Sequence, residues 1–464
     1  MPTYLNPEIY TENISVFPPN VEEVDSAQPA FVGYTEKAMK LVPNDLILLP
    51  VKISSIKEYE LFFGKPFCQM LEFEVSKVSS SEFILHEYKD PAPQYLLYFC
   101  VRLYFENGGT PCYILSVGTY QNPPIITLSK ETGDGQYGLL DGLNKLADVA
   151  DLSLIIIPEA VRLAEIDFST LAQATLKQCG TLGNRFAIFD IPHGEQPTLD
   201  LAHNRSLFGD NYLNYGSVYY PFVRTKMKYP VNVEESNVRI KFRGEIQPLW
   251  LMKKTNRVLR LFVLNEIKKR SIVIPSCGVV AGVFTFTDKN RGVWKSPSNL
   301  NLVGVSEPVI YIDNQQQELL TKDPQHGKSI NAIRYFADKG IQVWGSRTLM
   351  GKHTEWRYVP VCRFFMMVKE SLWKSTSWVI IEPNEPKTWL KVVVMIEHYL
   401  SLKWKEGALA GVSPLMAFYV KCGLGTTMTE RDIQDGKVLI EVGLAILRPG
   451  EFIVLKFSHH QKRE

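Results

Sequence analysis

The sequence has little net charge and no overall excess of one sign. Its 51 Lys and Arg residues nearly balance its 49 Asp and Glu residues, which leaves a formal net charge of +2. A chain balanced in this way has no global field that would attract nucleic acid or an anionic lipid surface. The one local basic cluster, in residues 252–270, predicts a solvated or subunit-facing surface, with a phosphate or membrane role as the alternative.

The sequence also contains no closely spaced cysteine pair and no long apolar run. The seven cysteines are odd in number, scattered, and form no CxxC pair, which favours reduced buried thiols over a disulfide framework or a zinc site. The longest purely apolar stretch, near residues 154–157, is too short for a membrane span. Residues 1–13 contain no basic region followed by an apolar run, so we expect no signal peptide.

No complete catalytic motif is present. The sequence lacks a G-x-S-x-G elbow, an HExxH helix and a calcium loop. The segment GDGQYG (133–138) has the letters of a dinucleotide fingerprint, but its candidate acid, Asp151, precedes the next strand instead of ending it. His459 and His460 offer weak metal ligands, although we expect them in a solvated chain end. We therefore predict no enzyme activity, catalytic residue, cofactor or metal; the alternative is a cytosolic hydrolase or nucleotide-binding enzyme on an α/β domain.

The chain does contain a long alternation of strand-like and helix-like segments. Strands are predicted near 29–35, 51–53, 111–118, 152–158 and 185–192, with helices between them. This alternation predicts a mostly parallel sheet with helices on its faces. Residues 205–275 are less regular and predict an insertion, so we assign residues 25–328 to an α/β domain with an insertion near 205–275.

From Ser329 the pattern predicts an α+β domain that extends to residue 464. Ser329 is expected to cap a helix over 329–340, followed by helices over 358–373 and 384–407. Strands are expected at 341–349, 378–383 and 417–421, and a helical turn at 429–435.

The last apolar segment, VLIEVGLAILRPGEFIVLKF (438–457), predicts a β-hairpin that turns at Arg448, Pro449 and Gly450. An isolated hairpin is marginally stable, and an exposed apolar edge invites another strand. Residues 1–24 contain four prolines among apolar residues, which predicts an extended N-terminal arm that docks on another surface.

Five separated blocks of the sequence share one resemblance. The blocks are FPPNVEEVDSAQPAFVGYTEKA (17–38), YFENGGTPCYILSVG (104–118), GVVAGVFTFTDKNRGVWKSPSN (278–299), AIRYFADKGIQVWGSRTL (332–349), and FYVKC with IEVGLAILRPGEFIVLKF (418–457). They resemble the contractile phage tail sheath family, and the resemblance is greatest to sheath proteins of phage-tail-like extracellular contractile injection systems of the antifeeding-prophage type. It runs in order through nearly the whole chain and is weakest at 226–271.

The resemblance implies a fold and a mechanical function. The fold would be a multidomain α/β and α+β chain: a middle domain of subtilisin-like topology without a catalytic site, a tube-proximal C-terminal α+β domain ending in a β-hairpin, and an extended arm. The sequence lacks the G-T-S-x-A segment of a subtilisin nucleophile, so protease activity does not follow. The function would be that of a structural sheath protein that polymerises helically around an inner tube and contracts to drive the tube through a target envelope.

The implied partners are copies of the chain in hexameric rings, with or without paralogous sheath subunits, together with the inner tube protein and the baseplate and terminal cap proteins. Direct nucleic-acid binding and a membrane span are not expected. The protein would be made and assembled in the bacterial cytoplasm and become part of a phage tail or a released, extracellular contractile particle.

The family likeness also implies a β-sheet shared between neighbouring subunits, to which the arm and the C-terminal strands contribute. Its members in this chain would be Leu5, Ile9, Tyr10, Ile14, Ile440, Val442, Leu444, Ile446, Phe452, Val454 and Phe457. Candidates for contact with the tube lie in the polar turn before the hairpin, with a solvated turn as the alternative: Glu430, Arg431, Asp432 and Asp435.

Overall fold

The structure is a computed structural model of the chain and describes residues 20–79, 82–86, 91–129, 137–197, 200–232, 234–323, 325 and 327–461. It divides into two compact units. The α/β unit is Asp25–Met366, and the C-terminal unit combines Met1–Val24 with Met367–Glu464. The division falls inside helix α10 (Val359–Ser375). The boundary predicted at residue 329 differs from this division, because the strands after residue 329 belong to the sheet of the α/β unit.

An eight-stranded sheet with the order β15-β14-β8-β7-β6-β1-β5-β2 forms the core of the α/β unit. Its inner strands pair in parallel, as the alternation predicted, and the edge strands β2 and β15 pair antiparallel. Every residue of β1 is buried, as expected for a strand covered on both faces. The strands are β1 (Pro29–Thr35), β2 (Val51–Ile53), β5 (Cys112–Thr119), β6 (Leu154–Ile156), β7 (Phe186–Asp190), β8 (Gly216–Tyr220), β14 (Asn331–Phe336) and β15 (Gly340–Trp344).

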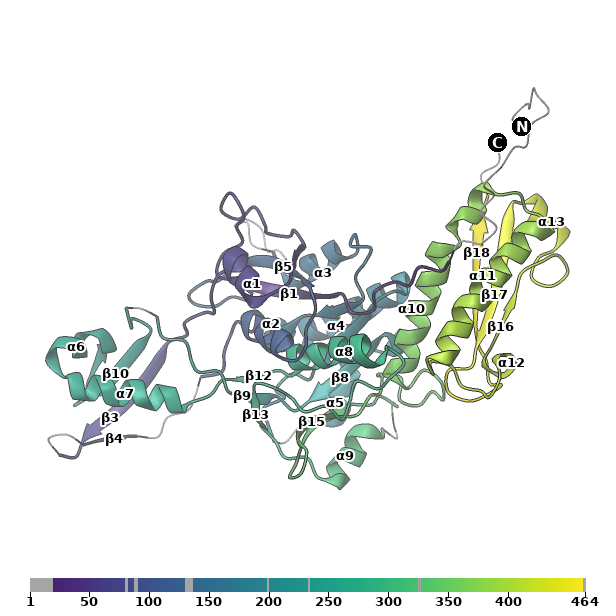
Figure 1. Cartoon of the computed structure of the whole chain (residues 1–464). Helices are drawn as coiled ribbons and strands as arrows, with labels where there is room; N and C mark the ends of the chain where they lie inside the picture. The colour runs from purple at the N-terminus through teal and green to yellow at the C-terminus, as the bar shows by residue number, and fades with distance from the viewer. Residues whose placement is uncertain are drawn as a thin grey trace, which may run out of the picture. The chain divides into compact units, whose positions relative to one another are not determined.

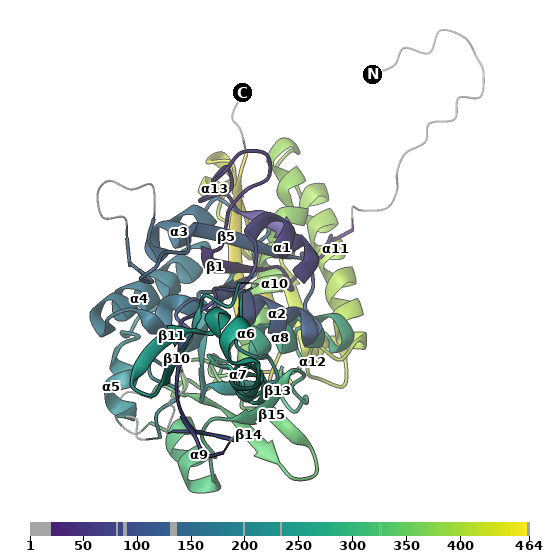
Figure 2. The ribbon, with the colours of Figure 1, turned by 90° about the vertical axis from the view of Figure 1, so that its left-hand side faces the viewer.

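Helices cover both faces of this sheet (Figure 1). Helix α2 packs beside α8, whereas α3 packs beside α4 on the opposite face (Figure 2). Ser55 caps α1, because its hydroxyl oxygen accepts a hydrogen bond from the backbone N–H of Glu58. The helices of the unit are α1 (Ile56–Phe63), α2 (Leu97–Glu106), α3 (Leu139–Leu146), α4 (Glu165–Leu182), α5 (Leu201–Ser206), α8 (Cys277–Arg291) and α9 (Asn314–Thr321). A small sheet adds β9 (Val223–Thr225), β12 (Val273–Ile274) and β13 (Val305–Pro308).

Two glycines set the close approach of α8 to α2. A Cβ atom at Gly278 would lie 2.5 Å from the carbonyl oxygen of Cys100, and a Cβ at Gly282 would lie 2.7 Å from that of Tyr104. Both pairs are one helical turn apart, so the two backbones touch along a seam that only glycine permits. The sequence of residues 277–291 carries no clear helical signal, because its glycine and β-branched content disfavours a helix in isolation.

Two predicted elements are wrong. The helix expected over 329–340 is strand β14, which leads through a turn at Gly340 (φ +72°) into β15. Pairing with β8 and burial of Ala332 and Ile333 override the helical spacing of the apolar residues. The strand expected at 378–383 is a 3₁₀ helix, η4 (Ser377–Ile381), in which only Val379 is buried.

The predicted insertion is built from two separate chain segments. Strands β3 (Leu71–Lys77) and β4 (Phe83–Leu85) join β10 (Val238–Phe242) and β11 (Glu245–Pro248) in the order β11-β10-β3-β4. Helices α6 (Met252–Thr255) and α7 (Arg257–Lys269) accompany this sheet, and α7 buries Leu259, Val263 and Ile267. We call residues 71–86 and 226–271 the lobe. The insertion was predicted to begin near residue 205, which is too early, because β8 lies in the main sheet.

The C-terminal unit combines helices with a three-stranded antiparallel sheet, β16-β17-β18. Strand β17 (Lys437–Leu444) pairs with both β16 (Phe418–Lys421) and β18 (Ile453–His460). Residues 438, 440, 442 and 444 alternate as predicted and are buried. The helices are the C-terminal part of α10, α11 (Pro386–Lys405), α12 (Pro414–Ala417) and α13 (Glu430–Gln434). Among the described residues, no helix has the length and apolar character needed to cross a membrane.

Candidate functional site

Buried carboxylates lie at or beyond the carboxyl ends of two strands of the main sheet. Ligands of such sheets bind beyond the carboxyl ends of the strands, often at a helix N-terminus. Here Glu159 follows β6, and its Oε1 accepts hydrogen bonds from the backbone N–H groups of Leu96 (2.9 Å) and Leu97 (2.8 Å), where α2 begins. Glu159 is fully buried. Its carboxylate therefore occupies the position of an anionic ligand.

A second carboxylate plays the same role at the next strand. Asp190 ends β7 and accepts hydrogen bonds from the Ser276 N–H (2.8 Å), the Ser276 hydroxyl (2.7 Å) and the Cys277 N–H (3.0 Å), where α8 begins. None of the described histidines hydrogen-bonds to Asp190 or Ser276, and the described residues contain no group of three metal-ligating side chains. The Asp–Ser pair is thus a buried helix cap without the base that a nucleophile requires.

Glu159 should make stability depend on pH. Burial raises its pKa from 4.5 to about 7, although the hydrogen bonds from Leu96 and Leu97 act in the opposite direction. Between these values the folded chain holds a proton that the unfolded chain has released, so stability falls as pH rises, by up to about 3 kcal/mol. We expect Glu159→Gln to abolish this fall, measured as the urea midpoint from pH 4.5 to 8. The exposed control Glu72→Gln should keep the wild-type slope, and an unchanged slope in Glu159→Gln would contradict the assignment.

The described end of the arm is fastened inside the C-terminal unit. The backbone N–H of Glu22 donates to Ser375 Oγ (2.9 Å), and that of Val24 donates to Ser371 Oγ (3.0 Å). Alternate residues of an extended chain lie about 6.6 Å apart, close to the about 6 Å between residues four apart on a helix. The spacing of Ser371 and Ser375, one turn apart on α10, therefore matches the spacing of the two N–H groups that they accept from.

Glu23, between these two residues, is held by helix α11. Its Oε2 lies 2.6 Å from Lys403 Nζ and accepts a hydrogen bond from the Tyr399 hydroxyl at 2.9 Å. Burial alone would lower the pKa of Lys403, but the carboxylates of Glu23 and Glu406 outweigh it and raise this pKa above its ordinary value. We call Glu22–Val24 and its four partners the arm clamp: Ser371, Ser375, Tyr399 and Lys403. The sequence offered only the Ser371/Ser375 spacing as a signal for it.

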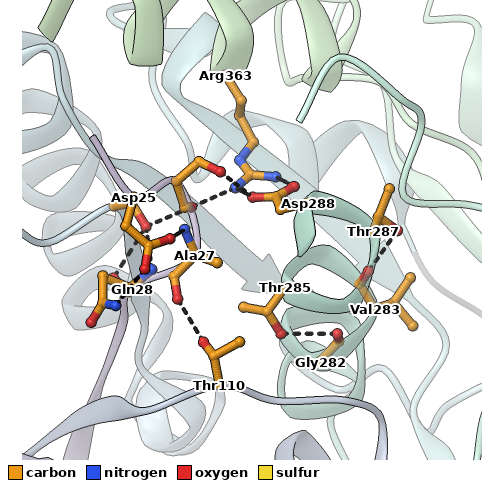
Figure 3. A network of polar contacts seen from close by, with 12 residues as sticks. Asp25, Ala27, Gln28, Thr110, Gly282, Val283, Thr285, Thr287, Asp288 and Arg363 are labelled. Atoms are coloured by element: carbon orange, nitrogen blue, oxygen red, sulfur yellow. Dashed lines mark hydrogen bonds and ion pairs between the residues drawn. The ribbon is translucent and has the colours of Figure 1, made fainter. Parts of the chain in front are cut away.

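The residues that follow the clamp are fixed within the α/β unit. Arg363 bonds both carboxylate oxygens of Asp288 on α8, with Nη1 2.9 Å from Oδ1, and its Nη2 donates to the backbone oxygen of Ser26 at 2.9 Å (Figure 3). The Ser26 hydroxyl donates to Asp288 as well, at 2.8 Å. The side chains of Arg363 and Asp288 are only 4% and 2% exposed. The base of the arm is therefore anchored by a buried ion pair.

The terminal sheet places the predicted inter-subunit residues in two environments. Ile440, Val442 and Leu444 lie on β17, the central strand, and are buried within the chain, so Val442→Lys would test folding rather than assembly. Val454 faces the other side of β18 and is exposed. Phe452 and Phe457 are partly buried, as is Ile446 beyond the end of β17. The arm residues Leu5, Ile9, Tyr10 and Ile14 lie outside the described residues.

The expected solvated chain end is wrong for His459. This residue lies in β18, is buried, and shares a 2.7 Å hydrogen bond with Thr376 Oγ1. Burial, followed by the neighbouring His460, lowers its pKa below the ordinary value. Strand β18 extends three residues further than predicted, and this extension brings the imidazole into the core.

The four tube-facing candidates share one polar turn around α13. Asp432 has a local role, because its Oδ2 accepts hydrogen bonds from the Thr429 N–H (3.0 Å) and hydroxyl (2.7 Å) in a capping box. These hydrogen bonds lower the pKa of Asp432. Asp435 lies 3.5 Å from Lys437, whereas Glu430 and Arg431 are exposed.

Comparison with known proteins gives consistent matches. The chain matches no protein-family model. It is 29% identical over 122 residues to a putative prophage major tail sheath protein of Pseudomonas aeruginosa (strain UCBPP-PA14), a match that covers 26% of this chain and 30% of that relative. It therefore spans about a third of the length of that curated relative.

Two solved structures match along the whole chain. A chain of the anti-feeding prophage baseplate is 27% identical, with a TM-score of 0.62 and coverage of 99% of this chain and 100% of that chain. A chain of the anti-feeding prophage helical sheath in the contracted state is 26% identical, with a TM-score of 0.63 and coverage of 98% and 99%. Because both matches cover nearly the whole chain at more than 25% identity, they indicate more than a shared arrangement of helices and sheets.

The matches agree on one class of protein: the chain is similar to tail sheath proteins. Along nearly its full length it is similar to chains of the anti-feeding prophage, including its helical sheath in the contracted state.

Proposed function

We propose that this protein polymerises helically around an inner tube and contracts to drive the tube through a target envelope. The full-length match to a helical sheath in its contracted state carries this proposal. The extended polymer would be kinetically trapped, and firing would move the subunits into a lower-energy packing. The step needs no nucleotide, which fits the buried carboxylates at the helix N-termini of the α/β unit. We therefore assign no enzymatic role.

The finer architecture is part of the same proposal. The α/β unit would have a subtilisin-like topology without catalytic residues, and the C-terminal unit would be proximal to the tube and end in a β-hairpin. Residues 1–24 would act as an arm that reaches a neighbouring subunit. In the described chain, β17 has both edges paired, so a neighbour's strand would join the sheet at β16 or β18. Ile440, Val442 and Leu444 would then support the shared sheet from its core.

The partners and location follow from this arrangement. The protein would assemble with itself in hexameric rings, with the inner tube protein and with baseplate and terminal cap proteins, alone or beside paralogous sheath subunits. Contact with the tube would use the α13 turn. Assembly would take place in the bacterial cytoplasm, and the product would be a phage tail or a released contractile particle.

Electron microscopy tests the proposal directly. Negative-stain images of the purified chain, alone and co-expressed with its tube protein, should show striated cylinders in at least one sample. Discrete small particles in both samples, together with a hydrolase or nucleotide-binding activity, would favour the enzyme alternative.

Removal of the arm should separate folding from assembly. We expect a variant lacking residues 1–19 to remain a folded monomer that forms no cylinders, because the arm serves a neighbour while the arm clamp stays intact. Size-exclusion chromatography and circular dichroism would measure both properties. The control is the full-length Glu23→Gln variant, which weakens the clamp but retains the arm and should still assemble. Normal cylinders from the truncated chain would contradict the role of the arm.

A further inference from the structure

The lobe carries a charge opposite to that of the rest of the chain. Residues 226–271 contain twelve Lys or Arg and four Asp or Glu, and residues 71–86 contain one and three. The remaining residues contain 38 basic and 42 acidic side chains. A chain of nearly zero net charge is thus divided into a basic lobe and an acidic remainder.

The basic side chains of the lobe border an exposed apolar surface on α7 and on the turn that precedes α6. Trp250, Val258 and Leu261 are 50%, 50% and 46% exposed. Val258 and Leu261 lie beside the buried residues of α7, which are Leu259, Val263 and Ile267. Helices α6 and α7 face the viewer in Figure 2. We call this surface the α6–α7 face; its members are Trp250, Lys253, Lys254, Arg257, Val258 and Leu261.

Two properties of the α6–α7 face point to a macromolecular partner. A hollow of about 670 Å³ opens beside Trp250 and Lys254, and Glu234 and Glu235 line it as well, Glu235 being paired with Arg260. Within the described part of the chain, Lys253, Lys254 and Arg257 form no ion pair. Exposed apolar side chains bordered by unpaired basic charge are typical of an interaction surface. The partner should be acidic and offer an apolar group.

The acidic part of the same chain offers this chemistry. Residues 137–210 contain ten Asp or Glu, of which Glu159 and Asp190 are buried, and five Lys or Arg. At the start of α4, Ile166 is 76% exposed between Glu165, which is exposed, and Asp167. Glu165 lies 3.1 Å from His203 on α5, and Asp210, beyond α5, has a side chain that is 86% exposed and lies 3.1 Å from Lys328 Nζ. An apolar group among carboxylates is thus available on every copy.

We propose that the α6–α7 face docks on the acidic surface around Ile166 of a second copy of the chain. This inference rests on the proposed function, which supplies the second copy at high local concentration. A contact between two different surfaces of identical subunits is heterologous, and heterologous contacts that do not close generate helical polymers. Charge complementarity would set the partner and the register, and the apolar groups would add buried area.

Reversing charge on each surface tests the contact. In the full chain co-expressed with its tube protein, Lys254→Glu/Arg257→Glu should lower the yield of sedimentable cylinders on the order of tenfold. Adding Glu165→Lys/Asp167→Lys to the same chain should restore the yield, because the two surfaces attract again with exchanged signs. The matched control Lys77→Glu/Arg243→Glu changes the charge of the lobe equally, at exposed residues away from the α6–α7 face, and should assemble normally.

The outcomes distinguish this inference from the proposed function. A wild-type chain that forms no cylinders would contradict both. Wild-type cylinders with an unchanged yield from Lys254→Glu/Arg257→Glu would overturn the docking alone, as would the absence of recovery in the combined variant. Sedimentation with phosphatidylglycerol vesicles tests the competing occupant: vesicle binding that depends on Lys254 and Arg257, with cylinders unaffected, would assign the face to a membrane and overturn the proposal. Should the reversed variant not fold, Lys254→Gln/Arg257→Gln should still lower the yield, and an unchanged yield would overturn the docking.

Discussion

Arg363→Ala should destabilise the α/β unit by about 3–5 kcal/mol, because removing one member of a buried ion pair leaves the other charge unpaired. Asp288 would keep only the hydroxyl of Ser26 as a partner within this network, and the Ser26 carbonyl would lose its donor. The guanidinium also lies 4.9 Å from the centre of the Phe284 ring, so the substitution removes packing as well. The measurement is the shift of the urea midpoint of unfolding, followed by circular dichroism.

A double-mutant cycle separates the ion pair from its surroundings. Arg363→Met/Asp288→Leu replaces both charges with apolar groups and should be less destabilised than the sum of Arg363→Met and Asp288→Leu, because neither charge remains unpaired. Additive effects would show that the pair contributes little beyond packing. The exposed pair Arg448 and Glu451, 3.3 Å apart, is the matched control, and Arg448→Ala should change stability by less than about 1 kcal/mol.

Under the proposed function, the same ion pair would also bear on assembly, because Ser26 follows the arm clamp by two residues and its backbone oxygen accepts a hydrogen bond from Arg363. We expect Arg363→Ala to form shorter cylinders than the wild-type chain, measured by electron microscopy.

Sequence patterns predicted the parallel sheet and most of its helices because each element carries its own signal. Strand β1 is apolar at nearly every position, and α1 begins at a serine cap. The element β14 escaped prediction because it is buried on both sides at Ala332 and Ile333 and shows no two-residue alternation. It is a strand because it pairs with β15, the strand that follows it, and with β8, which lies 110 residues earlier in the chain.

The terminal sheet, the arm clamp and the lobe were harder to predict from the sequence. The alternation in 438–444 was visible, but it could not show that β16 occupies the second edge of β17, since β16 lies 16 residues upstream across a turn and a helix. The arm clamp joins residues 22–24 to residues 371–403, and no local pattern links them. The two-segment lobe was missed for the same reason, because β3 and β10 pair across 160 residues of chain.

Gly282→Val should strongly disrupt the seam between α2 and α8. A Cβ at this position would lie 2.7 Å from the carbonyl oxygen of Tyr104 and 2.8 Å from Asn107 Cβ, so the helices must separate. Overpacking of this kind costs about 1–3 kcal/mol for added methylenes in a core, and more where backbone blocks the new atoms. We expect at least about 3 kcal/mol for Gly282→Val and a smaller loss for Gly282→Ala, measured by urea denaturation.

The consequence should extend beyond the seam, because α8 also carries Asp288 and begins at the cap formed by Asp190. A displaced α8 would pull its end of the ion pair away from Arg363, so Gly282→Val and Arg363→Ala should be less than additive when combined. Gly423→Ala is the matched control: its Cβ would meet the movable Thr426 hydroxyl at 3.2 Å and no backbone atom. A loss of stability in Gly423→Ala as large as in Gly282→Ala would show that glycine itself, rather than the helix contact, determines the effect.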